Sequence, residues 1–524
     1  MQEKYYLEIG NAKDKLLKSP RDRAIYRFLE MLPGLLSWGT LFFVVLMSKF
    51  APVFIAFFII AFDIYWLLKT VFLSFHMRTS YKTMRRYMKI DWLDKLKNDF
   101  SSQQKNWQKL YHLIVMPFYK EPFDVLEKTL KAILAANYPK EKMIIVLGSE
   151  QRAGEQAQET ARQIKEKYGD KFYKFLITIH PSNIVGELAG KGSNITFAGR
   201  QAKKEIVDAL SLPYENIIVS ALDCDTQIYP EYFGRLTYAF LEAENPYRSS
   251  FQPIPLFNNN IWEAPAISRV VATSGTFWHM MQQERPERLA TFSSHAMSFK
   301  ALAEVDFWNA KNVSEDSRIF WKCLLHYDGD YEVVPLFYPV SMDANLAPAF
   351  LDTMANIYRQ QRRWGWGAEN IAYVIFGFLK NRKISLGTKI FWTFNHIEGF
   401  WSWATNALIL LLLGWLPLFL GGPAFNVTVL SYNLPQVTRF IMTLAMIGLI
   451  SSAVVSTLLL PPRPEKYKKF RHLSMVLQWI LLPVTILIFG ALPGLEAQTR
   501  LLLGKYMGFW VTPKSSKSQI ARQK

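Results

Sequence analysis

The sequence of 524 residues contains very few cysteines. The two that are present, Cys224 and Cys323, are too few for a disulfide framework. Neither lies in a Cys-x-x-Cys pair or a Cys/His cluster, so neither a structural zinc site nor a small secreted domain is supported. Internal repeats and low-complexity linkers are lacking as well.

Acidic residues are the minority among the charged ones. Lys and Arg number 61 against 43 Asp and Glu, which gives a formal net charge of +18. Such an excess could indicate nucleic-acid binding, but the basic residues concentrate beside long apolar runs. That distribution is typical of cytoplasmic flanks facing anionic lipid. The basic segments are residues 13–27, 78–97, 463–471 and the tail after Arg500. We therefore expect membrane lipids as partners and no nucleic acid.

Hydrophobic residues make up 50% of the chain and collect in long runs near both ends. Residues 32–48 and 51–72 are each long enough to cross the ~30 Å hydrocarbon layer. Their basic flanks predict a transmembrane hairpin with both outer ends in the cytoplasm. The first run starts too far into the chain, and a second follows too closely, for a cleavable signal peptide. Asp63 in the second run is a functional candidate or a locally paired acid.

The middle of the chain has a different pattern. Short buried-strand candidates rich in β-branched residues alternate with helix-like stretches, and they lie at residues 113–116, 143–147, 175–179 and 217–222. This alternation predicts a mostly parallel sheet with crossover helices, in which ligands bind at the carboxyl ends of the strands. Apolar runs at 400–420, 440–460 and 475–492 predict a second membrane block.

Asp223-Cys224-Asp225 directly follows the strand predicted at 217–222. Two carboxylates at this spacing on a strand end can reach one hard cation, and magnesium or manganese prefers such oxygen ligands. An isolated Asp-x-Asp would often be a solvated loop, so the metal-site prediction depends on the buried strand before it.

Asp316, at the start of a predicted helix, suits a general base that takes the proton of an acceptor hydroxyl. Ser314, Glu315 and Asp316 could equally cap the helix, and the two interpretations can coexist.

Two further motifs offer groups for phosphates and sugars. In Gln360-Gln361-Arg362-Arg363-Trp364, Arg offers paired donors for a diphosphate and Trp a flat face for a sugar ring. The alternative is a basic-aromatic helix lying in the membrane interface. Gly190-Lys191-Gly192-Ser193-Asn194 offers a mobile backbone and a cation for phosphate, although its spacing is not that of a P-loop.

Taken in order along the chain, these motifs resemble the membrane-integrated family 2 glycosyltransferases, which include cellulose and hyaluronan synthases. The series runs from Met116-Pro117-Phe118-Tyr119-Lys120-Glu121 through the Gly-Lys-Gly-Ser-Asn, Asp-x-Asp, Glu315-Asp316 and Gln-Gln-x-Arg-Trp motifs. Near the C-terminus, Phe509-x-Val511-Thr512-x-Lys514 is similar to the gating-loop motif of bacterial cellulose synthase. The resemblance implies an α/β GT-A (Rossmann-like) cytoplasmic catalytic domain inserted between α-helical transmembrane blocks. It also implies inverting transfer from a nucleotide sugar, most often a UDP-sugar.

The resemblance further implies roles for individual residues. Asp316 would be the catalytic base, and Asp223 and Asp225 would hold the diphosphate and a divalent cation, magnesium or manganese. The implied nucleotide-sugar contacts are Tyr119, Glu121, Glu150, Lys191, Asp223, Gln360 and Arg363. The implied acceptor-binding residues are Glu315, Ser294, His295 and Trp364, and the implied gating loop carries Phe509, Val511, Thr512 and Lys514. Two departures from the family pattern are Glu150, which lies where an Asp pair is usual, and His295 in the acceptor motif.

We expect five parts along the chain. They are a basic segment with the hairpin and an amphipathic linker (1–110), a GT-A glycosyltransferase domain (111–348), interfacial helices (349–397), a C-terminal transmembrane block (398–499) and a basic tail with the gating-loop-like motif (500–524). The whole is expected to be a multi-pass protein of the cell membrane, inner or plasma, with its catalytic domain in the cytoplasm. Three apolar runs after this domain would put the tail outside, but its basic residues favour the inside. We therefore expect the run marked by Pro483 and Pro493 to re-enter or to lie at the interface.

The favoured function is a hexosyltransferase that elongates a polysaccharide, with a nucleotide sugar and a glycan or lipid-linked acceptor as partners. One alternative is the transfer of a single sugar to a lipid or polyprenyl-phosphate carrier, although the Gln-x-x-Arg-Trp motif favours polymerisation. A second, from another class, is an inactive transport or scaffold membrane protein, against which the intact acids argue. The membrane block is a candidate exit path for the glycan. Tryptophans that could stack on sugars are Trp392, Trp401, Trp403 and Trp415, although interfacial aromatic belts are the commoner explanation.

Overall fold

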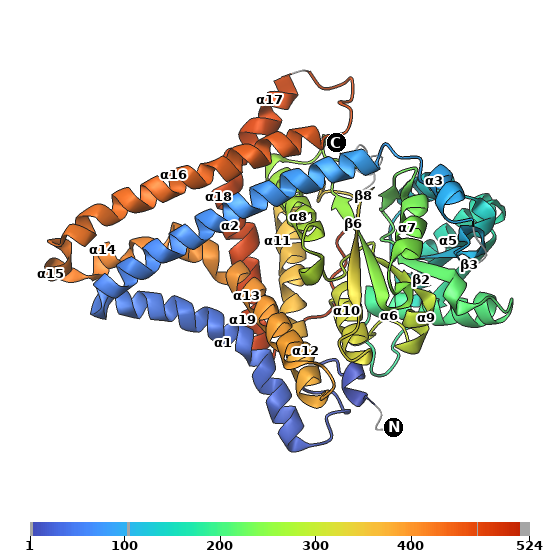
Figure 1. Ribbon diagram of the computed structural model, residues 1–524, viewed down its shortest axis with the longest axis horizontal. Coiled ribbons are helices and arrows are strands. Elements are labelled where there is room, and N and C mark those ends of the chain that lie inside the picture. The colour runs from blue at the N-terminus through green and yellow to red at the C-terminus, as the bar shows by residue number, and fades with distance from the viewer. Residues whose placement is uncertain (1–3, 102–104, 469, 514–524) are drawn as a thin grey trace.

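A mixed sheet of eight strands forms the centre of the α/β domain (Figure 1). The computed structural model describes residues 4–101, 105–468 and 470–513. In sheet order the strands are β3 (Lys174–His180), β2 (Met143–Glu150), β1 (Tyr111–Pro117), β4 (Ile217–Ala221), β7 (Ala296–Ser298), β6 (Ser249–Leu256), β8 (Glu332–Ser341) and β5 (Gln227–Ile228). The first four are parallel, as the sequence predicts, and β7 is antiparallel to both of its neighbours.

Helices cover both faces of this sheet because alternate residues of each buried strand point to opposite sides. Leu113 and Val115 of β1 pack into a cluster with helix α6 (Lys191–Ala202) and helix α10 (Glu315–His326). Ile114 and Met116 face the other cluster. The helices of that face are α4 (Phe123–Leu134), α5 (Glu155–Tyr168) and α7 (Tyr232–Glu242). Each fully buried aliphatic side chain contributes about 1.5–3 kcal/mol, so burial on both faces stabilises the sheet strongly.

Long apolar helices form the second half of the molecule. Among the described residues, four are long and apolar enough to cross a membrane: α1 (Pro20–Phe50), α2 (Pro52–Tyr87), α16 (Val429–Leu458) and the segment Phe470–Leu502. Helix α13 (Leu386–Leu411) and residues 413–420 would add a fifth span if this pair, bent by 49°, is counted as one. Every apolar run noted in the sequence coincides with one of these segments to within two residues.

The long helices converge at the end remote from the sheet, on the left of Figure 1. There the turn between α1 and α2 meets the chain after α13, since Ala56 packs with Phe425 and Leu434. At the other end α2 and α16 reach the α/β domain, where Met77 and Met84 pack with Ile254 and Ala453. Helices α1, α2 and α16 and the α13 pair therefore run between the sheet and the remote end.

The segment Phe470–Leu502 is placed differently. It consists of α17 (Phe470–Leu477), α18 (Leu482–Ile486) and α19 (Leu492–Leu502), joined by short 3-10 and π turns. These pieces follow one another along the boundary between the helices and the sheet in Figure 1. The early part contacts α8 (Ala266–Gln283) and the late part contacts α11 (Phe350–Gly365), both of which lie next to the sheet. Both ends of this segment are thus on the side of the α/β domain.

Shorter helices complete the fold. They are α3 (Trp92–Asp99), α9 (Phe299–Glu304), α12 (Glu369–Lys380), α14 (Leu416–Leu420) and α15 (Gly422–Asn426). After α19 the described residues 503–513 have no regular structure, and they return to the α/β domain, where Phe509 lies against Gly190.

Candidate active site

Three segments far apart in the sequence meet at the carboxyl edge of the sheet. Lys191 opens α6, Asp223 follows β4 directly, and Asp316 lies in the first turn of α10. Lys191 Nζ is 2.7 Å from Asp223 Oδ1 and 2.7 Å from Asp316 Oδ2. Glu315 Oε1 lies 3.6 Å from the same nitrogen. The Lys-centred cluster, defined as Lys191, Asp223, Glu315 and Asp316, therefore joins three of the sequence motifs in one place.

Local packing explains why the segments approach so closely. A Cβ atom on Gly192 would lie 3.1 Å from Glu315 Cβ and 3.0 Å from the Asn309 carbonyl oxygen, so glycine allows α6 and α10 to touch. Asn194 Nδ2 donates to the Gly148 carbonyl at 2.9 Å and ties the start of α6 to β2. Thr291 Oγ1 donates to the Asp316 carbonyl at 2.6 Å and ties α10 to the acceptor motif.

The charges in the cluster shift one another's protonation. Burial alone would lower the pKa of Lys191, but the carboxylates of Asp223 and Asp316 outweigh burial and raise it above its ordinary value. Burial and the neighbouring charge of Asp316 raise the pKa of Glu315, which is 1% exposed. Lys191 therefore stays charged, while burial favours the protonated form of Glu315.

Asp225 lies outside this cluster. It is buried, its Oδ2 accepts from the Asp343 backbone N–H at 3.1 Å, and its carbonyl accepts from Asn259 Nδ2 at 3.1 Å. Asp223 Oδ2 accepts from Ser293 Oγ at 2.6 Å. Within the described ranges, no three His, Cys, Asp or Glu side chains are grouped so that they could hold a metal ion by themselves.

The predicted acceptor residues are buried to different degrees. Ser294 and His295 are fully buried, and Ser294 adopts a positive φ of 65°. Ser294 Oγ lies 3.2 Å from Thr226 Oγ1. Trp364 lies partly exposed on α11, with its ring centroid 6.1 Å from that of Phe257.

Three of the residues predicted to contact the nucleotide sugar lie at the ends of β1 and β2, namely Tyr119, Glu121 and Glu150. The Tyr119 backbone N–H donates to Glu121 Oε2 at 2.6 Å. Both carboxylate oxygens of Glu150 accept from Arg152, whose guanidinium carbon lies 4.7 Å from the centre of the Tyr119 ring. Arg152 is a residue that sequence reasoning missed, although its position two residues after Glu150 at a strand end was a usable signal.

The C-terminal tail reaches the same edge of the sheet. A Cβ atom on Gly190 would lie 2.5 Å from Phe509 Cγ, so the Phe509 ring rests directly on that glycine. The Arg363 guanidinium lies 4.9 Å from the centre of the same ring. Val511 is partly buried and Thr512 is buried, whereas Lys514 lies outside the described residues.

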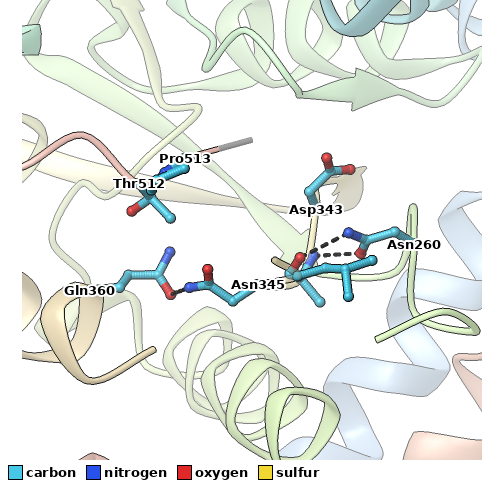
Figure 2. Close-up of a pocket in the computed structure, with 8 residues that line it drawn as sticks. Asn260, Asp343, Asn345, Gln360, Thr512 and Pro513 are labelled. Atoms are coloured by element: carbon cyan, nitrogen blue, oxygen red, sulfur yellow. Dashed lines mark hydrogen bonds between the residues drawn. The ribbon is translucent and has the colours of Figure 1, made fainter. Parts of the chain in front are cut away.

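A small cavity that is open to solvent lies between the tail, α11 and the end of β8 (Figure 2). Its lining includes Thr512, Gln360 and Asn345, and Asn345 Nδ2 donates to Gln360 Oε1 at 3.0 Å. The carboxylate of Asp343 also lines it. A second small cavity adjoins it and continues past Trp364 to Phe257. Asp343 and Asn345 were not singled out from the sequence, since no motif marks the end of β8.

Comparison with protein families decides the class of the chain. The family model described as Glycosyl transferase family group 2 matches residues 218–491, more than half of the sequence. The chain belongs to this glycosyltransferase family. The mixed sheet with its covering helices is accordingly a GT-A-like catalytic domain accompanied by apolar helices, as the sequence predicts.

Solved structures of other glycosyltransferases are similar to this family member at low identity. The mannosyltransferase PcManGT from Pyrobaculum calidifontis, in complex with GDP-Man and Mn²⁺, is 15% identical with a TM-score of 0.42, and the match covers 76% of this chain and 98% of that one. S. aureus TarS 1–349, in complex with UDP-GlcNAc, is 12% identical with a TM-score of 0.36, covering 76% and 93%. No curated protein matches the sequence.

Proposed function

We propose that this glycosyltransferase is a membrane-integrated enzyme of the cellulose synthase and hyaluronan synthase type. It transfers a hexosyl group from a nucleotide sugar, most often a UDP-sugar in that family, with inversion. The observation that carries the proposal is the meeting of Asp223 and Asp316 at Lys191, on the edge of the sheet where α/β domains bind ligands. The order of the motifs along the chain supports the subtype.

Asp316 is the proposed base. It takes the proton of the acceptor hydroxyl as that oxygen bonds to the anomeric carbon, and the bond from this carbon to the diphosphate oxygen breaks on the opposite face. Lys191 and Arg363 bind the negative charge that collects on the departing diphosphate. Lys191 now pairs with Asp316, so its long side chain has to turn towards the phosphates and leave the carboxylate able to accept a proton.

A divalent cation, magnesium or manganese, fits the donor set of Asp223 and Asp225, provided that phosphate oxygens complete its shell. Such an ion would draw charge from the diphosphate when bound. The complex of PcManGT with GDP-Man and Mn²⁺ is consistent with this use of a cation.

The two adjoining cavities are the proposed path of the acceptor. They combine the aromatic faces of Trp364 and Phe257 with the amides of Asn345 and Gln360, a mixture suited to the faces and hydroxyls of a sugar. We favour repeated transfer to a growing polysaccharide. The alternative is a single transfer to a lipid or polyprenyl-phosphate acceptor, and the length of the product on a gel distinguishes the two.

The residues from Tyr506 to Thr512 are proposed to act as a gating loop over the donor. Tyr506 OH donates to Glu30 Oε2 of α1 at 2.6 Å, and Arg27 donates to the Leu501 and Leu502 carbonyls at 2.8 and 2.7 Å. The base of the loop is thus tied to α1, while Phe509 and Thr512 lie beside the donor motifs. A loop that is anchored by hydrogen bonds at its base can lift and close over a ligand through the segment beyond it.

We propose that α1, α2, α16 and the α13 pair cross the inner or plasma membrane, and that Phe470–Leu502 lies along the interface. The contacts of that segment with α8 and α11 support this arrangement. An even number of crossings puts the α/β domain and the tail on one side, the cytoplasm. We propose the same five parts along the chain: residues 1–110, 111–348, 349–397, 398–499 and 500–524.

A donor panel tests the function. Purified protein in lipid is given radiolabelled UDP- and GDP-sugars with magnesium, with manganese or with a chelator. Transfer or hydrolysis of at least one donor, abolished by the chelator, is the expected result. Absence of turnover with every donor under every condition would favour the inactive transport or scaffold protein instead.

A further inference from the structure

His295 lies behind the proposed base and out of reach of an acceptor. Its side chain is 1% exposed, whereas that of Asp316 is 21% exposed. His295 Nδ1 is 3.7 Å from Asp316 Oδ1 and 2.9 Å from the Phe292 carbonyl oxygen. On the opposite side of the ring, Trp308 Nε1 lies 3.2 Å from His295 Nε2.

The indole of Trp308 determines which nitrogen of His295 carries the proton. An indole N–H can only donate, so Nε2 of His295 must accept and Nδ1 must carry the hydrogen. Trp308 is itself 1% exposed and cannot turn away without disrupting the core. Burial lowers the pKa of His295, although Asp316 and Asp223 oppose the shift, so the ring is held neutral beside Lys191. The Nδ1–H is therefore donated to the Phe292 carbonyl at 2.9 Å, and Asp316 Oδ1 lies 3.7 Å from the same nitrogen.

We propose, on the basis of the role proposed for Asp316, that His295 is a positioning residue for this base. Lys191 holds both oxygens of Asp316 at 3.0 and 2.7 Å. When Lys191 turns to the diphosphate, that hold is lost, and the Nδ1–H of His295 remains facing Oδ1. A short movement of the carboxylate closes the 3.7 Å gap to a hydrogen bond and leaves the outer oxygen directed at the acceptor.

Two amide substitutions separate this role from simple packing. In His295→Asn, the side-chain amide nitrogen occupies nearly the place of Nδ1, which keeps a donor towards Asp316. In His295→Gln, the side-chain amide oxygen takes the place of Nε2 and accepts from the Trp308 indole N–H, and the Nδ1 donor is lost. We expect His295→Gln to lower kcat by about tenfold or more with the donor KM changed by less than about twofold, because only the orientation of the base is lost. His295→Asn should retain most of kcat.

Asp316→Asn, measured in the same assay, separates failure of this inference from failure of the proposed function. If the Asp316→Asn protein is as active as the wild type, Asp316 is not the base, and the positioning role of His295 is wrong as well. If Asp316→Asn is inactive but both His295 variants turn over at the wild-type rate, the positioning role is wrong and the base assignment stands. If both His295 variants lose activity equally and unfold at lower temperature, His295 is a packing residue and the inference fails. An isolated loss of kcat in His295→Gln supports it.

Discussion

Lys191 is a partly buried cation, 11% exposed, that contacts carboxylates from two other segments. Replacing it with methionine keeps the length of the side chain but leaves Asp223, Glu315 and Asp316 facing one another without a counter-charge. It also removes a cation from the proposed diphosphate site. We expect Lys191→Met to lower transfer by about 100-fold or more in an assay with saturating donor, similar to the loss of one preorganised electrostatic donor elsewhere.

Lys203 offers a matched control in the π turn that continues α6. It pairs with Asp208 at the surface, with its side chain 36% exposed. Surface pairs of this kind contribute little, so Lys203→Met should change the rate by less than about twofold. Equal effects of the two substitutions would mean that the Lys-centred cluster has no special role.

His112 in β1 gives a pH dependence to the stability of the α/β domain. It is fully buried, its Nε2 lies 2.8 Å from Thr237 Oγ1, and burial lowers its pKa to about 3. Below an ordinary histidine pKa of about 6.5 the unfolded chain binds a proton that the folded chain refuses. The free energy of unfolding should therefore fall as pH drops from about 6.5 towards 3.

The contribution of His112 to that fall can be measured by thermal unfolding from pH 7 to pH 4. His112→Phe fills the same space without titrating, so its melting temperature should decline less steeply than that of the wild type. Identical slopes for the two proteins would show that His112 does not titrate with folding.

At the scale of elements, the contact between the tail and the start of α6 depends on Gly190, which has no side chain. The Cβ of Gly190→Ala would collide with Phe509, so the tail must move away. We expect a rise of about tenfold in the donor KM with a smaller change in kcat, because a lid that no longer closes weakens donor binding. Gly508→Ala is the control, since a Cβ there has nothing within 4 Å. The account of the tail is wrong if Gly190→Ala and Gly508→Ala behave alike.

Elements with strong local patterns could be predicted from the sequence. Strands β1 to β4 are continuous apolar segments, and the site residues at their ends followed from the rule that ligands bind there. The meeting of Lys191, Asp223 and Asp316 was expected from motif order, and its geometry needed the structure. Strands β5 and β7 have only two and three residues, too few for a periodic signal.

Other features could not be predicted from the sequence, because they depend on contacts between residues that are far apart along the chain. The indole of Trp308 defines the tautomer of His295 from a separate segment, and no spacing rule relates the two residues. Asp343 and Asn345 follow β8, whose two prolines and positive φ at Phe337 weaken its strand pattern. The bend after α13 and the position of Phe470–Leu502 beside the α/β domain are consequences of packing. Hydropathy therefore predicted the apolar segments but neither the bend nor that position.

At the scale of the whole molecule, the proposed topology puts the tail and the remote helix ends on opposite sides of the membrane. Both native cysteines are buried, so a single introduced cysteine can report its own accessibility. In intact cells, an impermeant thiol reagent should label Val427→Cys, which is 85% exposed at the remote end. Lys505→Cys, at an exposed position before the gating loop, should react only after the membrane is opened. Labelling of Lys505→Cys from outside would overturn the topology and the lid.

The most direct test of the catalytic centre is Asp316→Asn in lipid-reconstituted protein, with donor binding and sugar transfer measured on the same preparation. The substitution preserves shape but removes the group that accepts the acceptor's proton, so transfer should fall by about 100-fold or more while the donor Kd changes by less than about threefold. Transfer at the wild-type rate, with donor still bound, would contradict the assignment of Asp316 and the reaction proposed for the Lys-centred cluster.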